Sequence, residues 1–526
     1  MVLLETIPGA TWPGTWPIAL LVVGYILFRL FFAGPKLPDI PIIGVREGEW
    51  FPIVRARWRN ALNFKAAVLR AENEFGGRTT FLPIAGSRDV VLLPRSETQF
   101  VTDQPESVLS MHEEVMHTLQ TDYTCADPSL IHNPVHHKLI TTTLTNQVGN
   151  LVPDVVEETI WAFDQHWGSP EEYKEICLYE TMVKIIGGVT NRVFVGVPKC
   201  RDPELLRLGM AYAKLVPLTA QVLRSLWKPV RAAVALVSTI PVHLTTRKFT
   251  AILRPEIERR LAAYDARQRD PEDKSIEPER NDFLQWSIDQ AKAGNDPHMW
   301  KTSTLATRVL LLNFAAIHTS SFSITSVILD LVASKPEYIE ELRAEIQSVL
   351  AEHNGEWNKR ALARMEKLDS VFRESARLNS FVTVGLPRRV VAKDGITTPS
   401  GVKIPCGATV AVPSYAVLLD DDVYPDASTF NPFRFSDERS NQNVDYIKRA
   451  AKSFATTSTE YLAFGHGRNA CPGRFFAANE LKIMLAHVVL NYDFEMKESR
   501  PRNKWFGMVR VPPMQATVKI RRRVNT

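Results

Sequence analysis

The apolar positions of this chain separate an N-terminal run from a long series of helical and strand-like patterns. Residues 16–33 form an apolar run of 18 that only Arg29 interrupts, which is just long enough to span a bilayer. No Lys or Arg precedes Arg29, whereas a cleaved signal peptide, the alternative, begins with a basic segment. Because the first positive charges, Arg29 and Lys36, lie near the end of the run and after it, we predict a lumenal N-terminus and a cytosolic remainder. The pattern thus predicts a membrane anchor over residues 1–34, with its transmembrane helix at about 16–33.

A proline-rich stretch follows the apolar run. It contains Pro35, Pro38 and Pro41, and prolines favour a stiff, extended connector over a helix. We therefore predict a hinge over residues 35–44, which leaves residues 45–526 for the rest of the protein.

The longest helical pattern lies near the centre of the chain. It runs from Thr302 to Ser334 without Gly or Pro, and Lys335-Pro336 stops it. A membrane span is the alternative, but four polar residues interrupt the apolar pattern. These are Arg308, Asn313, His318 and Asp330. Small and hydroxyl residues occupy the middle of the helix, and they leave room for a ligand.

Shorter patterns predict strands. Residues 79–84 and 89–93 are β-like and flank a short turn, so they predict a hairpin. Further β-like runs lie within residues 384–412, where glycines mark the turns. These glycines are Gly395, Gly401 and Gly407.

Charge and cysteine content exclude several classes of function. Lys and Arg number 63 against 58 Asp and Glu, and the net charge of +5 gives no argument for nucleic-acid binding. The five cysteines are far apart and form no Cys-x-x-Cys pair. This argues against a disulfide framework or a zinc site and suits a reducing compartment.

One cysteine lies in a chemically distinctive loop. Residues 464–474, Phe-Gly-His-Gly-Arg-Asn-Ala-Cys-Pro-Gly-Arg, are glycine-rich and lead into an amphipathic helical pattern. The apolar positions of that pattern are Ala478, Leu481, Leu485, Val488 and Tyr492. Cys471 is therefore predicted at a helix N-terminus, where N–H groups and the helix dipole stabilise a metal-binding thiolate.

Two other interpretations of the loop remain open on these residues alone. Gly465-x-Gly467-x-x-Ala470 could be a dinucleotide fingerprint, which would indicate a nicotinamide or flavin enzyme, but that motif follows a strand at the start of a βαβ unit. Here it lies in the last eighth of the chain. Cys471 could also be a buried structural cysteine.

The loop resembles the haem-thiolate signature of the cytochrome P450 family, Phe-x-x-Gly-x-Arg-x-Cys-x-Gly. Phe464, Gly467, Cys471 and Gly473 match it. The resemblance implies that Cys471 is the metal ligand and that Phe464 lies in the cofactor site. The family arginine that reaches a haem propionate is replaced by Asn469, so the neighbouring Arg468 becomes the candidate for that contact.

The central helix resembles the oxygen-binding helix of the same family, Ala/Gly-Gly-x-Asp/Glu-Thr. Ala316 replaces the glycine, His318 replaces the acid and Thr319 matches. The resemblance implies that Thr319 relays protons in catalysis and makes His318 a catalytic candidate. A satisfied core histidine is the alternative for His318. Since an imidazole titrates near neutrality, a catalytic His318 would make proton delivery depend on pH between about 5.5 and 7.5.

Further motifs extend the resemblance. Glu374 and Arg377 are spaced as the family's Glu-x-x-Arg pair, and Arg434 lies in a matching Pro-x-Arg-Phe run. Together they imply a bidentate network that supports the cysteine loop. Arg389, five residues before Asp394, matches a family arginine that binds a propionate, with Arg388 as the alternative. In the helix predicted within residues 135–151, Lys138 and His137 are weaker candidates for the same role.

The resemblance implies a mainly α fold, a helical prism with small β-sheets, behind the N-terminal transmembrane helix. Residues 45–526 would then be a haem-thiolate monooxygenase domain that binds haem b and inserts one oxygen atom from O₂ into a hydrophobic small molecule. Electrons would come from a separate NADPH-cytochrome P450 reductase, because the chain has no flavin domain. The implied location is the endoplasmic reticulum membrane, with lipid as a further partner and no nucleic acid.

The central helix and the cysteine loop look most like fungal enzymes of the ent-kaurene-oxidase type, which act on terpenoids and other secondary metabolites. A haem-thiolate isomerase or dehydratase that works without O₂ is an alternative function. A nicotinamide-dependent oxidoreductase and a non-catalytic membrane ligand carrier are two more.

Overall fold

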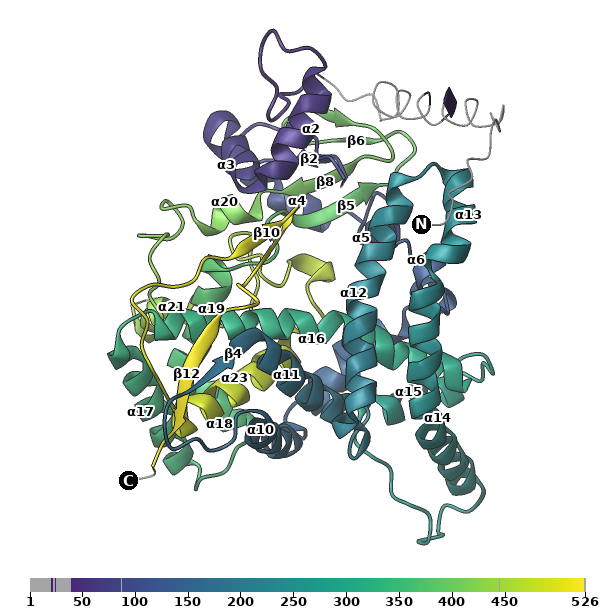
Figure 1. The fold of residues 1–526 in the computed structure, drawn as a ribbon, viewed down its shortest axis with the longest axis vertical. Coiled ribbons are helices and arrows are strands. Elements are labelled where there is room, and N and C mark those ends of the chain that lie inside the picture. Colours follow the sequence, from purple (N-terminus) through teal and green to yellow (C-terminus); the bar gives the residue numbers. More distant parts are fainter. Residues whose placement is uncertain (1–19, 22–23, 25–38, 87, 444, 525–526) are drawn as a thin grey trace, which may run out of the picture.

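A computed structural model describes residues 20–21, 24, 39–86, 88–443 and 445–524. Nearly all of the predicted anchor over residues 1–34, with its transmembrane helix at about 16–33, and the first part of the predicted hinge lie outside these residues. The described chain is mainly helical with small β-sheets (Figure 1), so this part of the expected fold class is confirmed, and the N-terminal transmembrane helix stays a prediction.

The helices and strands have the following bounds. The helices are α2 (Pro52–Leu62), α3 (Phe64–Phe75), α4 (Thr98–Asp103), α5 (Met111–Leu119), α6 (Thr121–Thr124), α7 (Ser129–His132), α8 (Val135–Leu139), α9 (Thr145–Gln147), α10 (Val152–His166), α11 (Leu178–Phe194), α12 (Pro203–Ser225), α13 (Lys228–Ser238), α14 (Ile240–Arg269), α15 (Phe283–Ala293), α16 (Thr302–Val332), α17 (Pro336–Glu352), α18 (Lys359–Arg364), α19 (Glu366–Leu378), α20 (Ser414–Leu418), α21 (Arg434–Ser440), α22 (Tyr446–Ala450) and α23 (Arg474–Asn491). The strands are β1 (Thr80–Leu82), β2 (Val90–Leu92), β3 (Leu109–Ser110), β4 (Lys174–Cys177), β5 (Gly385–Val390), β6 (Ile396–Thr397), β7 (Lys403–Ile404), β8 (Thr409–Val412), β9 (Tyr492–Phe494), β10 (Lys504–Phe506), β11 (Val509–Val511) and β12 (Thr517–Arg522). A π-helical segment, η2 (Ile140–Leu144), joins α8 to α9.

Helix α16 crosses the middle of the molecule (Figure 1). It contains no Gly or Pro and ends just before Pro336 begins α17, as the sequence predicts. Among the described residues it is the one helix long and apolar enough to cross a membrane, but 67% of its most apolar stretch is buried inside the protein. It packs against α11, α12, α14 and α19. We therefore assign α16 to the core.

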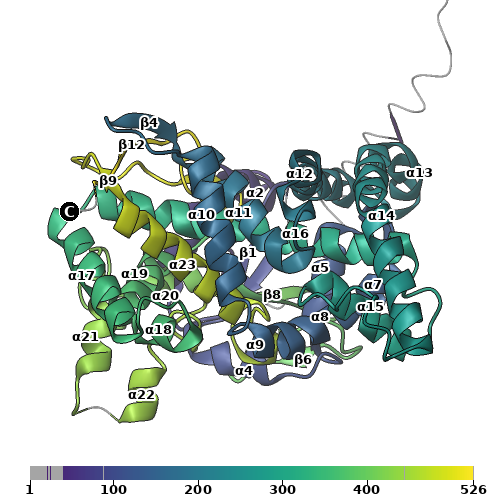
Figure 2. The ribbon, with the colours of Figure 1, turned by 90° about the horizontal axis from the view of Figure 1, so that it is seen from below.

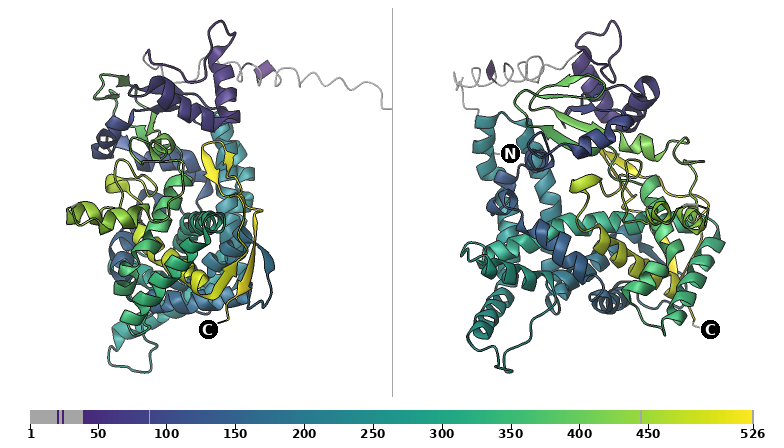
Figure 3. Two further views of the ribbon diagram at one scale, coloured as in Figure 1. Left: turned by 90° about the vertical axis from the view of Figure 1, so that its left-hand side faces the viewer. Right: turned by 180° about the vertical axis from the view of Figure 1, so that it is seen from behind.

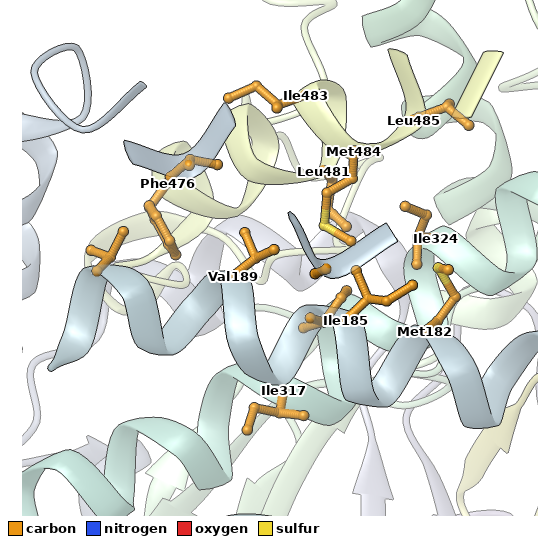
Figure 4. Close-up of a cluster of buried hydrophobic side chains, with 14 of the residues drawn as sticks. Met182, Ile185, Val189, Ile317, Ile324, Phe476, Leu481, Ile483, Met484 and Leu485 are labelled. Atoms are coloured by element: carbon orange, nitrogen blue, oxygen red, sulfur yellow. The ribbon is translucent and has the colours of Figure 1, made fainter. Parts of the chain in front are cut away.

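The core around α16 is built from neighbouring helices. Figure 4 shows buried side chains of α11, α16 and α23 packed together. Helix α10 lies beside α23 on the side seen in Figure 2. Burying each Leu, Ile, Met or Phe side chain in such a core stabilises the fold by roughly 1.5–3 kcal/mol. This packing fixes α23, the helix that follows the cysteine loop, against the central helix.

A five-stranded sheet lies at one end of the molecule, together with α2 and α3 (Figure 3). Its strand order is β1-β2-β8-β5-β3, and β1 and β2 form the predicted antiparallel hairpin. Arg388 lies opposite Val410 and Arg389 lies opposite Thr409 in the β5–β8 pair. Because side chains alternate along a strand, the two arginines project from opposite faces of the sheet.

Candidate functional site

The loop that carries Cys471 is held by short backbone contacts. The Cys471 N–H donates to the Phe464 carbonyl at 2.8 Å, which closes the loop on itself. Gly467 has a φ of +73°, and a Cβ at this position would lie 2.9 Å from the Thr102 Cβ in α4. A residue other than glycine would therefore strain the backbone and clash with α4.

The environment of the Cys471 thiol combines burial with hydrogen-bond donors. Burial raises the pKa of Cys471, while the N–H groups of Gly473 and Arg474 and the Arg474 charge act in the opposite direction. Gly473 is the N-cap of α23, so these donors belong to the start of that helix, as the sequence predicts. A thiolate at this position would accept hydrogen bonds from these N–H groups but would have little contact with water. A bound metal cation would compensate its charge.

Thr319 and His318 project in different directions from α16. The Thr319 hydroxyl donates to the carbonyls of Ala315 at 2.9 Å and Ala316 at 3.1 Å. Ala315 is exposed although it lies in the middle of a mostly buried helix, so this face of α16 borders open space. His318 instead makes a hydrogen bond between its Nδ1 and the Tyr179 hydroxyl of α11 at 2.9 Å.

The surroundings of His318 revise the expected pH dependence. Burial lowers the pKa of His318, and the positive charge of Lys214 on α12 lowers it further, against a backbone hydrogen bond at Met210. The imidazole is therefore neutral at neutral pH, and its titration moves to lower pH than the sequence suggested. The contacts with α11 and α12 favour the alternative of a core histidine.

A buried carboxyl group that sequence reasoning missed lies behind this part of α16. Glu480 on α23 is 1% exposed and accepts a hydrogen bond from the Thr190 hydroxyl at 2.7 Å. Burial raises the pKa of Glu480 to about 7, although hydrogen bonds from Thr190 and Ser320 oppose this. Ser320 is the neighbour of Thr319. Glu480 was missed because α23 is buried on several sides, whereas the apolar spacing predicted a single buried face.

Replacing Glu480 with Gln is expected to stabilise the protein at alkaline pH. The folded protein holds this proton more tightly than the unfolded chain, whose pKa is 4.5, so stability falls as pH rises from about 4.5 to about 7. The loss is on the order of 3 kcal/mol at about 1.4 kcal/mol for each pKa unit. Glu480→Gln should remove it, which urea unfolding at pH 5 and pH 8 can measure.

The control for this experiment is Glu495→Gln, which removes an exposed carboxylate paired with Lys519. It should change stability by less than about 0.5 kcal/mol at either pH. An identical pH dependence in wild type and Glu480→Gln would contradict the assignment of the titration to Glu480.

A buried ion network lies under the segment that precedes the cysteine loop. The guanidinium of Arg377 binds the Glu374 carboxylate through two hydrogen bonds of 2.8 Å, and both side chains are fully buried. Arg434 Nε contacts both oxygens of Glu374 at 3.2 Å. Arg377 also donates to the carbonyls of Leu418 and Ala427. The structure thus brings together all three residues that the sequence assigned to structural support.

Two of the predicted cofactor contacts, Arg468 and Lys138, differ in their surroundings. Arg468 is exposed, and its Nη2 donates to the carbonyls of Asp103 and Gln104 at the end of α4. Lys138 is exposed on α8, and no hydrogen bond or ion pair joins its ammonium to another described residue. The geometry therefore favours a structural role for Arg468 and gives Lys138 no defined contact.

Arg388 and Arg389 differ in their surroundings. Arg388 is buried; burial lowers the pKa of its guanidinium, and Glu106 opposes this. Glu106 also accepts a hydrogen bond from Asn469, the residue in place of the family arginine, at 2.7 Å. Arg389 is half-buried, and no hydrogen bond or ion pair joins its guanidinium to another described residue. An anionic group would satisfy Arg389 better than any described side chain does.

These observations fit the haem that the resemblance implies. Cys471 presents a sulfur with N–H donors at a helix start, which suits an iron ligand. Arg389 is a cation without a partner among the described residues, which suits a propionate. The side chains on the exposed face of α16 are small, so this face leaves room for the flat haem group.

Comparison with known proteins agrees with the family resemblance of the sequence motifs. The family model described as "Cytochrome P450" matches residues 97–520. Two monooxygenases of Postia placenta are similar: cytochrome P450 monooxygenase 103 is 35% identical over 434 residues, 81% of this chain and 82% of that protein. Cytochrome P450 monooxygenase 151 is 37% identical over 424 residues, 80% of this chain and 81% of that protein.

Two further matches extend over most of the chain. Cytochrome P450 monooxygenase astC of Aspergillus terreus is 29% identical over 527 residues, 98% of this chain and 97% of that protein. Among solved structures, retinoic acid-bound cyanobacterial CYP120A1 superposes with a TM-score of 0.65 at 19% identity. This match covers 93% of this chain and 100% of that one and bears on the fold alone.

Proposed function

This chain belongs to the cytochrome P450 family, and we propose that it is a membrane-anchored monooxygenase of fungal secondary metabolism that acts on a terpenoid or a related hydrophobic intermediate. Its family and its fungal relatives make it a haem-dependent monooxygenase that holds haem through a cysteine thiolate and receives electrons from a reductase. The observation that carries the proposal is the half-buried Cys471 thiol, which lies at the start of α23 with two N–H donors.

We assign the haem site to residues of this chain as follows. Cys471 would hold the iron, and the haem would supply O₂ binding and the insertion of one oxygen atom into a C–H bond. Phe464 would shield the sulfur; its ring packs against Phe454 with centroids 5.0 Å apart. Arg389 would bind a propionate, with Arg388 and its neighbour Glu106 beside the loop. Arg468 and Lys138 remain candidates for a propionate contact, and Arg468 would have to leave the carbonyls of Asp103 and Gln104 to make it.

Thr319 would relay protons to the reaction site. Its hydroxyl can rotate away from the Ala315 and Ala316 carbonyls and donate instead into the space beside α16. Thr319→Ala should keep substrate binding and NADPH consumption but divert oxygen to hydrogen peroxide, which lowers product per NADPH by about tenfold or more. Product, NADPH and hydrogen peroxide are measured together in the reconstituted system.

The matched control is Ser321→Ala, which removes a buried hydroxyl that donates to the Ile317 carbonyl on the same helix. It should leave the ratio of product to NADPH unchanged. Full coupling in Thr319→Ala would contradict the proton-relay role.

We propose that the chain is anchored in the endoplasmic reticulum membrane through residues 1–34, with residues 35–44 as the hinge and residues 45–526 as the catalytic domain. Large apolar side chains are exposed on or beside α2 and on α13, toward the upper end of Figure 1. These are Trp50, Trp58, Leu62, Leu236 and Val237. Together with the exposed Lys228, such a surface suits a lipid interface.

The test of the function uses the full-length protein with an NADPH-cytochrome P450 reductase. We expect a thiolate-type CO difference spectrum, and substrate-dependent NADPH and O₂ consumption. A haem-thiolate isomerase or dehydratase would give the spectrum without O₂ consumption. A nicotinamide-dependent oxidoreductase or a ligand carrier would give no such spectrum. Binding spectra with a terpenoid panel then narrow the substrate class.

A further inference from the structure

Four arginines from different elements lie around helix α5. Arg88 lies in the turn between β1 and β2, Arg224 near the end of α12, Arg231 on α13 and Arg389 on β5. The β1–β2 turn approaches α12 closely, since a Cβ on Gly86 would lie 3.6 Å from the Gln221 side chain. Helix α5 packs against both β5 and α12, so it contacts the elements that carry Arg389 and Arg224. We call Arg88, Arg224, Arg231 and Arg389 the arginine cluster.

The charges of the arginine cluster act on one another and on His117 of α5. Burial lowers the pKa of His117 to about 4, and the charges of all four arginines contribute to this. Burial, together with the charges of Arg224 and Arg389, lowers the pKa of Arg88 to about 10. Because the charges of all four arginines add to the effect of burial on His117, the four guanidinium groups lie near this side chain.

Carboxylates do not balance this charge. Among the described residues, Glu114 on α5 is the one acid that forms an ion pair with the cluster, through Arg88. Arg224 and Arg231 bond instead to the neutral side chains of Gln221 and Gln120. The Glu114 carboxylate is further occupied by the Thr409 hydroxyl of β8.

Several polar atoms of this region are buried without a hydrogen-bond partner in the part of the chain that the structure describes. They are the Nε atoms of Arg88, Arg224 and Arg231 and the Nδ1 atom of His117. Buried donors and cations are costly unless they are paired. Their convergence therefore indicates an anionic partner, whose oxygen atoms the forked guanidinium groups would bind.

We propose that the substrate is amphipathic, with a hydrophobic body at the haem and a carboxylate or phosphate group bound by Arg88, Arg224 and Arg231. This rests on the proposed monooxygenase function and specifies its substrate class. Arg389 is left to the haem propionate, whereas the other three come from the β1–β2 turn and from helices α12 and α13. Such an anchor would fix which carbon of the body lies at the reaction site.

A lipid headgroup is the other source of an anion, and the orientation of the side chains argues against it. Arg224 and Arg231 are half-buried and act on His117, so they are directed into the protein. Lys228, which lies between them in sequence, is exposed. A lipid surface would contact Lys228, and a substrate anion would contact the arginines.

The test compares matched pairs of probes on the haem-loaded, full-length protein. The probes are dodecanoic acid, methyl dodecanoate, dodecyl phosphate, abietic acid and methyl abietate, and binding is followed by the substrate-induced difference spectrum. We expect an acid or phosphate to bind at least about tenfold more tightly than the ester of the same skeleton, which corresponds to about 1.4 kcal/mol. Arg224→Gln and Arg231→Gln should each reduce this preference severalfold while ester affinity stays unchanged.

The control is Arg207→Gln, which alters an exposed arginine paired with Glu204 on the same helix α12. It should leave the preference unchanged. The CO difference spectrum of each variant shows that the haem site is intact, so its absence in wild type would indicate failure of the proposed function, not of this inference. If no acid or phosphate is preferred, or Arg224→Gln weakens binding only to phosphatidylserine vesicles, the anion subsite is overturned.

Discussion

Cys471→Ser is expected to abolish the thiolate-type CO difference spectrum. A serine hydroxyl stays protonated at neutral pH, so the N–H groups of Gly473 and Arg474 would have no thiolate to stabilise. Iron would lose its protein ligand, and activity with the reductase should fall below detection. The substitution is close to isosteric, so the fold around α23 should persist, which circular dichroism can check.

Cys406→Ser is the matched control for this experiment. Cys406 is exposed and makes a weak contact of 3.8 Å with the Val391 carbonyl. Cys125 and Cys200 are poor iron ligands, because burial raises the pKa of Cys125 to about 11 and that of Cys200 to about 12. A retained thiolate spectrum in Cys471→Ser would show that another cysteine binds the iron.

The residues that sequence reasoning located best are those whose role is fixed by local backbone geometry. The loop of Cys471 depends on glycines at positions where side chains clash, such as Gly467 against Thr102, and this requirement is visible as a motif. The long helix α16 followed from the absence of Gly and Pro before Pro336. The β1–β2 hairpin followed from two apolar runs around a short turn.

Residues whose role depends on packing between distant segments could not be located in this way. His318 faces Tyr179 of α11, a contact over 139 positions of sequence that no local pattern encodes. Glu480 is neighboured by Thr190, and the arginine cluster is assembled from four separate elements. The position of Arg468 in the motif suggested a contact with a haem propionate, but its guanidinium donates hydrogen bonds to carbonyls at the end of α4. Charge patterns alone did not reveal these neighbours.

The sequence also underestimated one interaction. Taken alone, the i, i+3 spacing of Glu374 and Arg377 predicts a surface ion pair of negligible energy. Both side chains are in fact fully buried, because α19 lies between α16, α21 and α23. Removing one partner from such a buried pair has a large cost, since the other charge cannot return to water.

Glu374→Ala is therefore expected to yield mostly haem-free, destabilised protein. It would leave the cations of Arg377 and Arg434 without their carboxylate, at a cost of roughly 3–5 kcal/mol, which is a large share of the stability of a typical domain. The loss should reach the haem site because Phe372 of α19 stacks on Phe454, and Phe454 packs against Phe464. Phe464 in turn accepts the Cys471 N–H.

Haem content per protein and the urea unfolding midpoint measure this effect, and Glu366→Ala is the control. Glu366 lies on the same helix, but its side chain is 43% exposed and contacts Arg439 at 3.2 Å. Its loss should cost at most about 1 kcal/mol and leave haem content unchanged. A folded, haem-loaded Glu374→Ala protein with an altered product would instead place Glu374 at the substrate. The burial of Glu374 between two arginines argues for the structural outcome, because every oxygen of its carboxylate is already bound within the network.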